Sequence, residues 1–467
     1  MKIKFILFTS CLMAMFASCT GELDQQPITS KVSTTFYKTE AEIEEGVNGV
    51  YDGLQRNGLY GLYMVALGEI QSDETYDEVP LNDDGNFGKL DDFTANSILG
   101  SVSSLWQASY VAIQRANIVL NRIDNVIFKD EAVKNARIGE MKFIRALVYF
   151  NMVRLYGDVP LVTQETTNPN SYFGQGRTSK DLVYNQILQD LTEAEPLLPV
   201  STSQAGKVIK TASQALLGKV YMTLNDWSNA KIWLDKAKGS NVHELVPLAD
   251  VFAINKETNK EIIFSVQFAS GINGNSEGSS MYQQYSPTGT ENGAKGHNLP
   301  TKSLYELYTA EDLRKGTYID ITSGGVPYSL KLTRNASVPA DGGSNVVVLR
   351  YADVLLMLAE IENELGNTAV AVSYLNQVRT RAGLSETAAT TQSEVRKAIE
   401  MERQLEFVCE GHRWFDLLRT GRAIEVMNKW FADQNIHITI DAHHLLLPIP
   451  LSQINTDASI KQNPGYE

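Results

Sequence analysis

The sequence predicts a mostly α-helical protein, in which tetratricopeptide-like helical hairpins carry a long, irregular, loop-rich lobe. Three observations predict this class. Apolar residues recur at helical spacing through residues 101–239, and a helix-pair pattern appears at 217–237 and again at 358–378. Two other segments, 57–100 and 240–345, are rich in Gly, Ser, Asn, Thr and Tyr. Long polar loops on a rigid scaffold are typical of binding proteins.

The N-terminus has the pattern of a secretory signal peptide over residues 1–18. Lys2 and Lys4 precede an apolar run at 5–16, and two small residues lead to Cys19. This run is shorter than the ~20 residues that span a bilayer. The small residues before Cys19 resemble a bacterial lipobox, in which the thiol is acylated and becomes the new N-terminus. We therefore expect a lipid on Cys19 and a polar tether over 19–35; ordinary secretion with an incidental Cys is the alternative.

Length and composition fit one large helical domain or two intimately packed lobes, and we predict a single domain over residues 36–467, with a helical frame at about 101–239 and 346–430. The hydrophobic content is 43%, which is normal for a folded protein. The net charge of −14 argues against a nucleic-acid partner, because phosphate backbones are bound mainly by Lys and Arg. With Cys19 acylated and Cys11 removed, Cys409 is the remaining thiol, so no intrachain disulfide is expected.

Two long helices are expected between residues 101 and 157. In the first, five apolar residues at three-, four- and seven-residue steps share one face. In the second, four more repeat this spacing up to Gly157, and Pro160 follows, which marks a helix end. The residues are Leu105, Ala112, Ala116, Val119 and Ile123, then Phe143, Ala146, Phe150 and Val153.

Helix-pair repeats follow this region. Small residues at Gly218 and Ala230 allow two antiparallel helices to approach, and Tyr221 and Leu234 fill the space between them. A weaker copy uses Leu358, Ala359, Ala371, Leu375 and Val378, with Gly366-Asn367 as its turn. A third candidate pairs the helix at Ala146 and Tyr149 with one near 182–191. Such hairpins stack into a solenoid-like scaffold.

The two irregular segments are expected to meet in space and to form a ligand lobe. Residues 262–268 alternate like a short strand, whereas 271–278 form a loop. The remainder has turn-forming composition.

A ladder of charged residues lies near the C-terminus, at Glu402, Glu406, Glu410 and Arg413. Spacings of four, four and three residues place them on one helix face. We interpret the ladder as ion pairs that seat the helix rather than as acid/base chemistry. Cys409, in the same helical pattern, is interpreted as a buried, inert thiol.

Three further patterns do not predict sites by themselves. Residues 274–278 match G-x-S-x-G, but the required following helix is missing. Gly85 as the sixth residue of a calcium loop would put Pro80 first, so only an irregular cation site among Asp73, Glu74, Asp77, Asp83 and Asp84 stays open. His443 and His444 are expected, with His437, in a strand and turn, where adjacent side chains point to opposite faces. We predict no metal and no cofactor.

Several sequence blocks together resemble the SusD/RagB family of outer-membrane lipoproteins. They run from the lipobox to the C-terminus, and their number and order make the resemblance specific. The blocks are Leu23-Asp24, 141–149 with 156–161, 350–360, 376–383, 406–421, 447–450 and 462–466. The resemblance implies a cell-surface lipoprotein of the Bacteroidetes type. Such a protein binds oligosaccharide, acts as a lid on a TonB-dependent, SusC-like transporter and performs no catalysis.

Loop aromatics are the predicted glycan contacts. Sugar rings present apolar C–H faces to aromatic rings, and their hydroxyls need amide and carboxylate partners. The candidates are Tyr60, Tyr63, Asp73, Glu74, Tyr76, Asp77, Asn86, Phe87, Tyr282, Gln283, Tyr285 and Asn292, with Gln284 beside them. Every Trp (106, 227, 233, 414 and 430) falls in a helical segment, which argues against a starch platform built on Trp. Replacing Tyr282 and Tyr285 with Ala is expected to weaken binding at a nearly unchanged melting temperature.

Two other functions stay open at this point. The first is a tetratricopeptide-type lipoprotein that binds proteins as an assembly factor. The second is a glycosidase, which needs two carboxylates ~5–9.5 Å apart across a cleft. The acidic segment 69–84 contains carboxylates that could fill this role.

Overall fold

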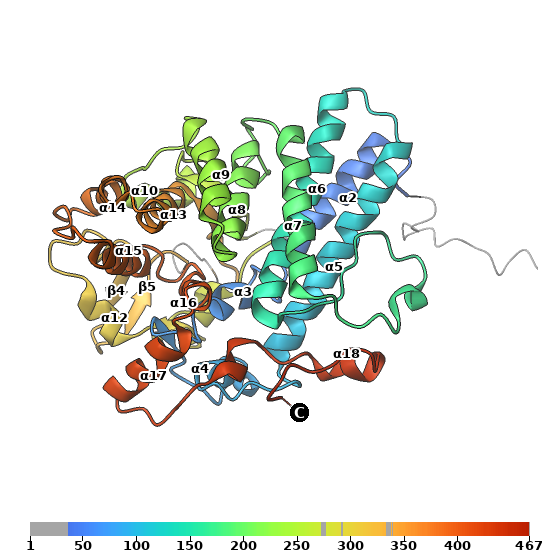
Figure 1. Ribbon diagram of the computed structural model, residues 1–467. Coiled ribbons are helices and arrows are strands. Elements are labelled where there is room, and N and C mark those ends of the chain that lie inside the picture. The colour runs from blue at the N-terminus through green and yellow to red at the C-terminus, as the bar shows by residue number, and fades with distance from the viewer. Residues whose placement is uncertain (1–35, 272–276, 291–292, 333–337, 339, 467) are drawn as a thin grey trace, which may run out of the picture.

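The computed structural model describes residues 36–466, apart from 272–276, 291–292, 333–337 and 339. Helices dominate, and the strands are short (Figure 1). The helices are α2 (Glu40–Leu54), α3 (Tyr63–Leu67), α4 (Gly88–Asp91), α5 (Gly100–Arg122), α6 (Glu131–Tyr156), α7 (Lys180–Ala194), α8 (Lys210–Thr223), α9 (Trp227–Gly239), α10 (Leu248–Val251), α11 (Met281–Gln284), α12 (Lys302–Leu307), α13 (Tyr351–Glu364), α14 (Thr368–Arg381), α15 (Gln392–Glu406), α16 (Arg413–Arg419), α17 (Ala423–Asp433) and α18 (Leu451–Thr456). The strands are β1 (Thr75–Tyr76), β2 (Ile262–Val266), β3 (Leu299–Pro300), β4 (Ile319–Ile321), β5 (Pro327–Ser329) and β6 (Val346–Arg350).

Successive helices stack in one row, from α5 through α6, α7, α8, α9 and α13 to α14 and α15. In Figure 1, α8 and α9 lie between the α5–α7 group and the α13–α15 group. The row contains three helix pairs, α6–α7, α8–α9 and α13–α14, and confirms the predicted hairpins. Each pair buries its apolar face against the next, which is how repeat proteins build a continuous core.

The two long helices, α5 and α6, form as predicted. The nine apolar residues that define their inner faces are all buried. Asp130 caps α6, since its carboxylate accepts a hydrogen bond from the Ala132 N–H at 2.8 Å. Gly157, with φ of +71°, ends the helix.

Close helix approach in the α8–α9 hairpin depends on Gly218. A Cβ at this position would lie 2.4 Å from Leu234 Cγ, so a larger residue would force the Leu234 side chain or α9 to move. In the α13–α14 hairpin, Ala371 and Leu375 are fully buried and Gly366 forms the turn with φ of +85°. Small residues at these contacts therefore set the spacing of the scaffold.

The strands form three two-stranded antiparallel sheets, β1–β3, β2–β6 and β4–β5. The strand predicted at 262–268 is found as β2, which ends two residues earlier, at Val266, and this residue pairs with Val346 of β6. The β1–β3 sheet pairs Thr75 with Pro300 and Tyr76 with Leu299. It therefore joins the two irregular segments, as expected.

The region predicted as one continuous charged helix is broken: α15 ends at Glu406 and α16 begins at Arg413. Cys409 has φ of +60° and Gly411 has φ of +78°, so the backbone turns there. Glu410 consequently lies in a turn rather than on a helix face. Cys409 is buried, and burial raises the pKa of its thiol well above the usual value, in agreement with the interpretation of an inert residue.

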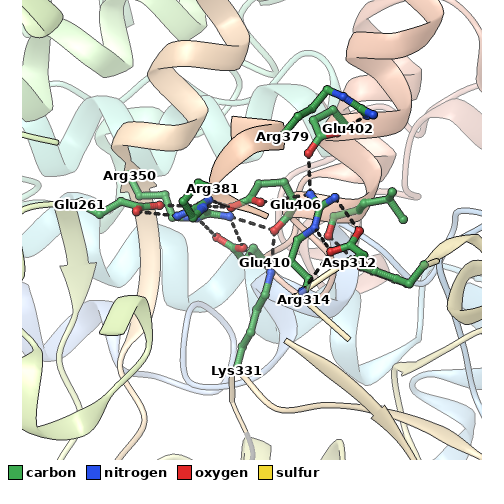
Figure 2. Close-up of polar contacts among 12 residues, drawn as sticks. Glu261, Asp312, Arg314, Lys331, Arg350, Arg379, Arg381, Glu402, Glu406 and Glu410 are labelled. Atoms are coloured by element: carbon green, nitrogen blue, oxygen red, sulfur yellow. Dashed lines mark hydrogen bonds and ion pairs between the residues drawn. The ribbon is translucent and has the colours of Figure 1, made fainter. Parts of the chain in front are cut away.

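A buried ion network links this turn to the scaffold and to the irregular lobe. The carboxylates of Glu402, Glu406 and Glu410 come from α15 and the turn after it, and Figure 2 shows cations approaching them from several segments. The partners are Arg314 and Lys331 of the lobe, Arg350 at the end of β6, and Arg379 and Arg381 of α14. Glu261 and Asp312 complete the network. The charged ladder thus forms ion pairs that hold the irregular lobe, as well as α15, against the helical scaffold.

The predicted strand around 436–444 is wrong. Residues 442–445 form a 3-10 turn instead, capped by Asp441. His443 and His444 therefore do not point to opposite faces: their rings lie 3.6 Å apart, centroid to centroid, and both approach the Asp441 carboxylate.

Candidate functional site

The candidate site lies where the two irregular segments pack together. Besides the β1–β3 pairing, the Tyr285 hydroxyl donates to the Leu62 carbonyl at 2.6 Å. The Ser279 hydroxyl donates to the Gly61 carbonyl at 3.0 Å. Residues more than 200 positions apart in the chain are thereby held in a fixed relation.

A buried histidine forms the base of this junction. His297 is fully buried, and its Nδ1 and Nε2 lie 2.8 Å and 2.9 Å from carboxylate oxygens of Asp77 and Asp83. Its ring stacks on Phe87, with centroids 4.2 Å apart. Lys295 adds an ion pair to Asp83 at 3.2 Å. Sequence analysis missed His297 and Lys295, because nothing in the local pattern places them opposite residues 77–87.

The structure contradicts the prediction that five of the candidate side chains contact a ligand, because all five are buried. They are Tyr60, Glu74, Asp77, Phe87 and Tyr285. Their polar atoms serve the interior: the Tyr60 hydroxyl accepts a hydrogen bond from Asn151 at 2.8 Å, and Asp77 holds His297. Because Tyr285 is buried, the prediction that its replacement with Ala leaves the melting temperature nearly unchanged is wrong.

Two more candidates have structural roles. Asp73 forms a two-pronged ion pair with Arg413 at 2.7 and 2.8 Å. Asn86 accepts a hydrogen bond from the Ser101 N–H at 2.8 Å and donates to the Asp83 carbonyl at 2.7 Å, so it ties its loop to the start of α5. Asn292 lies outside the described residues.

Tyr63, Tyr76, Tyr282 and Gln283 are partly exposed. Tyr63 packs on Phe87, with ring centroids 5.4 Å apart. Burial, and then the nearby charge of Asp83, raise the pKa of the Tyr63 hydroxyl. The Asp83 carboxylate forms an ion pair with the Lys295 ammonium group. The backbone N–H of Lys295 donates to the backbone carbonyl of Gln283 at 2.9 Å. We call the set Tyr63, Asp83, Tyr282, Gln283 and Lys295 the loop surface; Tyr76 lies on β1, on the same junction.

Electrostatics keep one carboxylate of the loop surface charged. Partial burial raises the pKa of Asp83, but hydrogen bonds from His297 and Lys295 outweigh it and lower that pKa below the usual value. Underneath, burial raises the pKa of Asp91 to about 7, although the Asp77 N–H donates to it. The exposed acid is therefore an acceptor for hydroxyl groups at neutral pH.

Comparison with known proteins identifies the family. A sequence model described as the SusD family matches residues 322–466, and one described as "Starch-binding associating with outer membrane" matches residues 23–222. The chain belongs to the SusD family. Among SusD-like proteins, P25 of Formosa agariphila is 28% identical over the full length of both chains. The starch-binding protein SusD of Bacteroides thetaiotaomicron is 22% identical, also over both full lengths.

Solved structures of SusD-like proteins share this fold. A laminarin-binding SusD-like protein is 29% identical, with a TM-score of 0.79 over 92% of this chain and 100% of that chain. The surface glycan-binding protein A of Bacteroides thetaiotaomicron, solved in complex with laminarihexaose, is 22% identical, with a TM-score of 0.77 over 91% of this chain and 100% of its own. The helical, tetratricopeptide-like fold predicted from the sequence is confirmed.

The acids at 69–77 of this SusD-family chain do not form an exposed catalytic pair. Glu69 and Glu74 are buried, and burial raises the pKa of Glu69 to about 8 and that of Glu74 well above its usual value. A raised pKa suits a general acid, but a substrate must also reach the group. Glu69 instead accepts hydrogen bonds from Asn298 and the Gly411 N–H.

The side chains that could bind a metal ion instead contact other residues of the protein. Within the described ranges, Asp441, His443 and His444 are the residues that bring three potential ligand atoms within 4.8 Å. The Asp441 N–H already donates to His444 Nδ1 at 3.1 Å, which completes the cap of the turn. The irregular cation site is not assembled, because Asp73 binds Arg413, Asp77 binds His297 and Glu74 is buried.

Two cavities lie away from the loop surface of this SusD-family chain. One, of about 460 Å³, separates α2 from β2 and is lined by Asn48, Gln55 and Gln267 among others. The other, of about 400 Å³, lies beside α15 and α16 and is lined by five arginines that are all paired with acids. In the part of the chain that the structure describes, no helix is both long enough and apolar enough to cross a membrane. The residues matching G-x-S-x-G fall largely outside the described ranges.

Proposed function

We propose that this protein is a cell-surface lipoprotein that captures oligosaccharides at the loop surface and delivers them to a TonB-dependent, SusC-like transporter. Membership of the SusD family supports glycan capture, as do its laminarin-binding relative and the relative solved with laminarihexaose. The observation that carries the proposal for the site is the loop surface itself. Partly exposed tyrosines there stand beside amide and charged groups on a rigid, buried base.

Binding at this surface follows from simple complementarity. Tyr63 and Tyr282 offer ring faces to the C–H faces of sugars, while Gln283, Asp83 and Lys295 offer acceptors and donors to hydroxyl groups. The His297 bridge and the β1–β3 sheet hold these groups in place before the ligand arrives. A preformed surface loses less conformational entropy on binding than a mobile one. No bond is made or broken in this mechanism.

The test is a calorimetric binding screen of the purified protein against a glycan panel that includes laminarin oligosaccharides and starch oligosaccharides. Laminarin oligosaccharides come first, because the 29% identical relative is a laminarin-binding protein. We expect saturable binding of at least one glycan class without release of new reducing ends. Released ends would instead indicate a glycosidase. Absence of binding across the panel, with capture of an envelope protein at the concave helical face, would favour the assembly factor.

Membrane attachment is proposed to depend on Cys19, which lies outside the described residues. Two or more acyl chains anchor a protein firmly, since each buried CH₂ contributes ~0.8 kcal/mol. We expect Cys19→Ala to move the protein from the outer-membrane fraction to the soluble fraction, while Cys409→Ala leaves it in the membrane. Quantitative blotting of fractionated cells measures both. Equal membrane association of the Cys19→Ala variant would refute the lipid anchor.

A further inference from the structure

Arg154 is a cation without an ion-pair partner among the residues that the structure describes. Its guanidinium lies between two aromatic rings, 3.9 Å from the centroid of Phe150 and 3.6 Å from that of Phe415. Nε donates to the Phe150 carbonyl at 3.0 Å, and Nη2 donates to the Asn151 side chain at 2.8 Å. Nη1 has no partner in the described part of the chain.

The charge of Arg154 is poorly compensated. Desolvation lowers the pKa of this guanidinium to about 10, so it stays protonated at neutral pH. Asp416, whose charge reaches Arg154, is already held by Arg403 and Arg419. Arg154 is partly exposed, so water hydrates only part of its charge, and a partly desolvated cation gains from a counter-ion.

Arg154 lines a cavity of about 40 Å³ between α3, α6, α8, β6 and the start of α16. A site needs roughly 10–15 Å³ to admit one water-sized particle. The cavity is therefore large enough for a halide ion, which is only slightly larger than water, and too small for a sugar or a nucleotide.

A second cation, Lys219, lines the same cavity. Its ammonium group binds Asp353 at 2.9 Å and lies 3.5 Å from His412 Nδ1. An ammonium has three donors, and within the described ranges nothing takes the third. Burial lowers the pKa of His412 to about 3, so this imidazole is neutral and adds no positive charge of its own.

Glu410 is the carboxylate that lines the cavity, and it is neutralised from behind. Arg350 and Lys331 bind it at 2.8 and 2.6 Å. Burial raises the pKa of Glu410, but these two cations outweigh burial and lower it below the usual value. The two groups left facing the cavity with unused donors are therefore both cationic, Arg154 and Lys219.

We propose that this cavity is a binding site for a small inorganic anion of halide size, held by Arg154 and Lys219. The bound anion supplies the missing counter-charge and links α6 to α8 and to the turn before α16. The site does not involve the loop surface, so the proposal stands or falls separately from glycan binding.

The first test is thermal unfolding of the purified protein in sodium chloride, sodium bromide and sodium gluconate at equal ionic strength and pH 7.5. Gluconate is too large for the cavity. We expect the melting temperature to rise with the logarithm of halide concentration, by about 2 °C over two decades, and to stay flat in gluconate. Crystals grown in sodium bromide are expected to show an anomalous peak in the cavity. Equal melting curves in the three salts together with a cavity that holds only water would overturn the proposal.

The second test removes the cation. Arg154→Met keeps an unbranched side chain, removes the guanidinium that contacts the two rings, and is expected to abolish the halide dependence of the melting temperature. Arg56→Met is the matched control, because Arg56 is exposed on the surface, and it should retain the full dependence. A halide response that survives in the Arg154→Met variant would also overturn the proposal. If this variant does not fold, the salt series and the bromide crystals of the unmodified protein still test whether the cavity binds an anion.

Discussion

Replacing Glu406 with Gln is expected to lower the free energy of unfolding by about 3–5 kcal/mol, which is the cost of removing one partner from a buried ion pair. Glu406 is fully buried. Its carboxylate binds Arg350 at 2.6 Å and Arg314 at 3.2 Å, and also binds Arg381. Gln keeps the volume but removes the negative charge, so three guanidiniums lose a shared counter-ion.

The same contacts predict a pH dependence. Burial alone would raise the pKa of Glu406, but Arg381, Arg350 and Arg314 outweigh it and hold that pKa well below its unfolded value of 4.5. A carboxyl whose pKa is lowered by folding stabilises the protein fully above its unfolded pKa. This stabilisation is lost as the pH falls below about 4.5 towards the folded value. The unmodified protein should therefore lose stability more steeply in acid than the Glu406→Gln variant.

Urea unfolding at pH 7 and pH 4 measures both effects. Glu425→Gln is the matched control, since the Glu425 side chain is 73% exposed and lies 3.8 Å from Arg422. It should change the free energy of unfolding by no more than about 0.5 kcal/mol. If Glu406→Gln were as mild as this control, the network of Figure 2 would not hold the lobe.

Tyrosines of the irregular lobe are expected to divide into two classes on mutation. Tyr63→Ala and Tyr282→Ala each remove a partly exposed ring. Each should weaken glycan binding about tenfold, equivalent to about 1.4 kcal/mol. The melting temperature should change little in Tyr282→Ala and fall modestly in Tyr63→Ala, because Tyr63 also packs on Phe87. Tyr285→Ala removes a buried ring and its hydrogen bond to Leu62, so it should cost about 3–5 kcal/mol of stability.

Calorimetric titration with the glycan identified by the panel, together with thermal unfolding, separates the two classes. Tyr172→Ala is the control for binding, because Tyr172 is also partly exposed but lies between α6 and α7, away from the lobe. Equal affinities for the Tyr63, Tyr282 and Tyr172 variants would place the glycan elsewhere. The groove between α2 and β2, with its Asn and Gln side chains, is then the next surface to test.

Local sequence patterns predicted the scaffold well. The face of α5, the end of α6 at Gly157 and the small residues between α8 and α9 all follow from spacing within one or two helices. Short-range patterns failed where one or two backbone φ angles change the direction of the chain. The positive φ values of Cys409 and Gly411 end a helix whose charge spacing looked continuous.

The candidate site was only partly predictable. That the segments 57–100 and 240–345 meet was correctly inferred from their shared composition, and the β1–β3 sheet confirms it. Which of their side chains face solvent was not predictable. Tyr282 and Tyr285 are three positions apart in the same short segment, yet Tyr282 is partly exposed whereas Tyr285 is buried, with its hydroxyl bonded to the Leu62 carbonyl just before α3.

The sequence by itself determined the helical hairpins and the family resemblance, because each depends on neighbouring residues or on ordered blocks along the chain; the lipid anchor at Cys19 stays a prediction. Only the tertiary structure decided which loop residues are interior, that His297 joins Asp77 to Asp83, and that Arg154 and Lys219 share a cavity. These features depend on burial and charge pairing between residues tens to hundreds of positions apart. No local pattern encodes the environment that such distant contacts create.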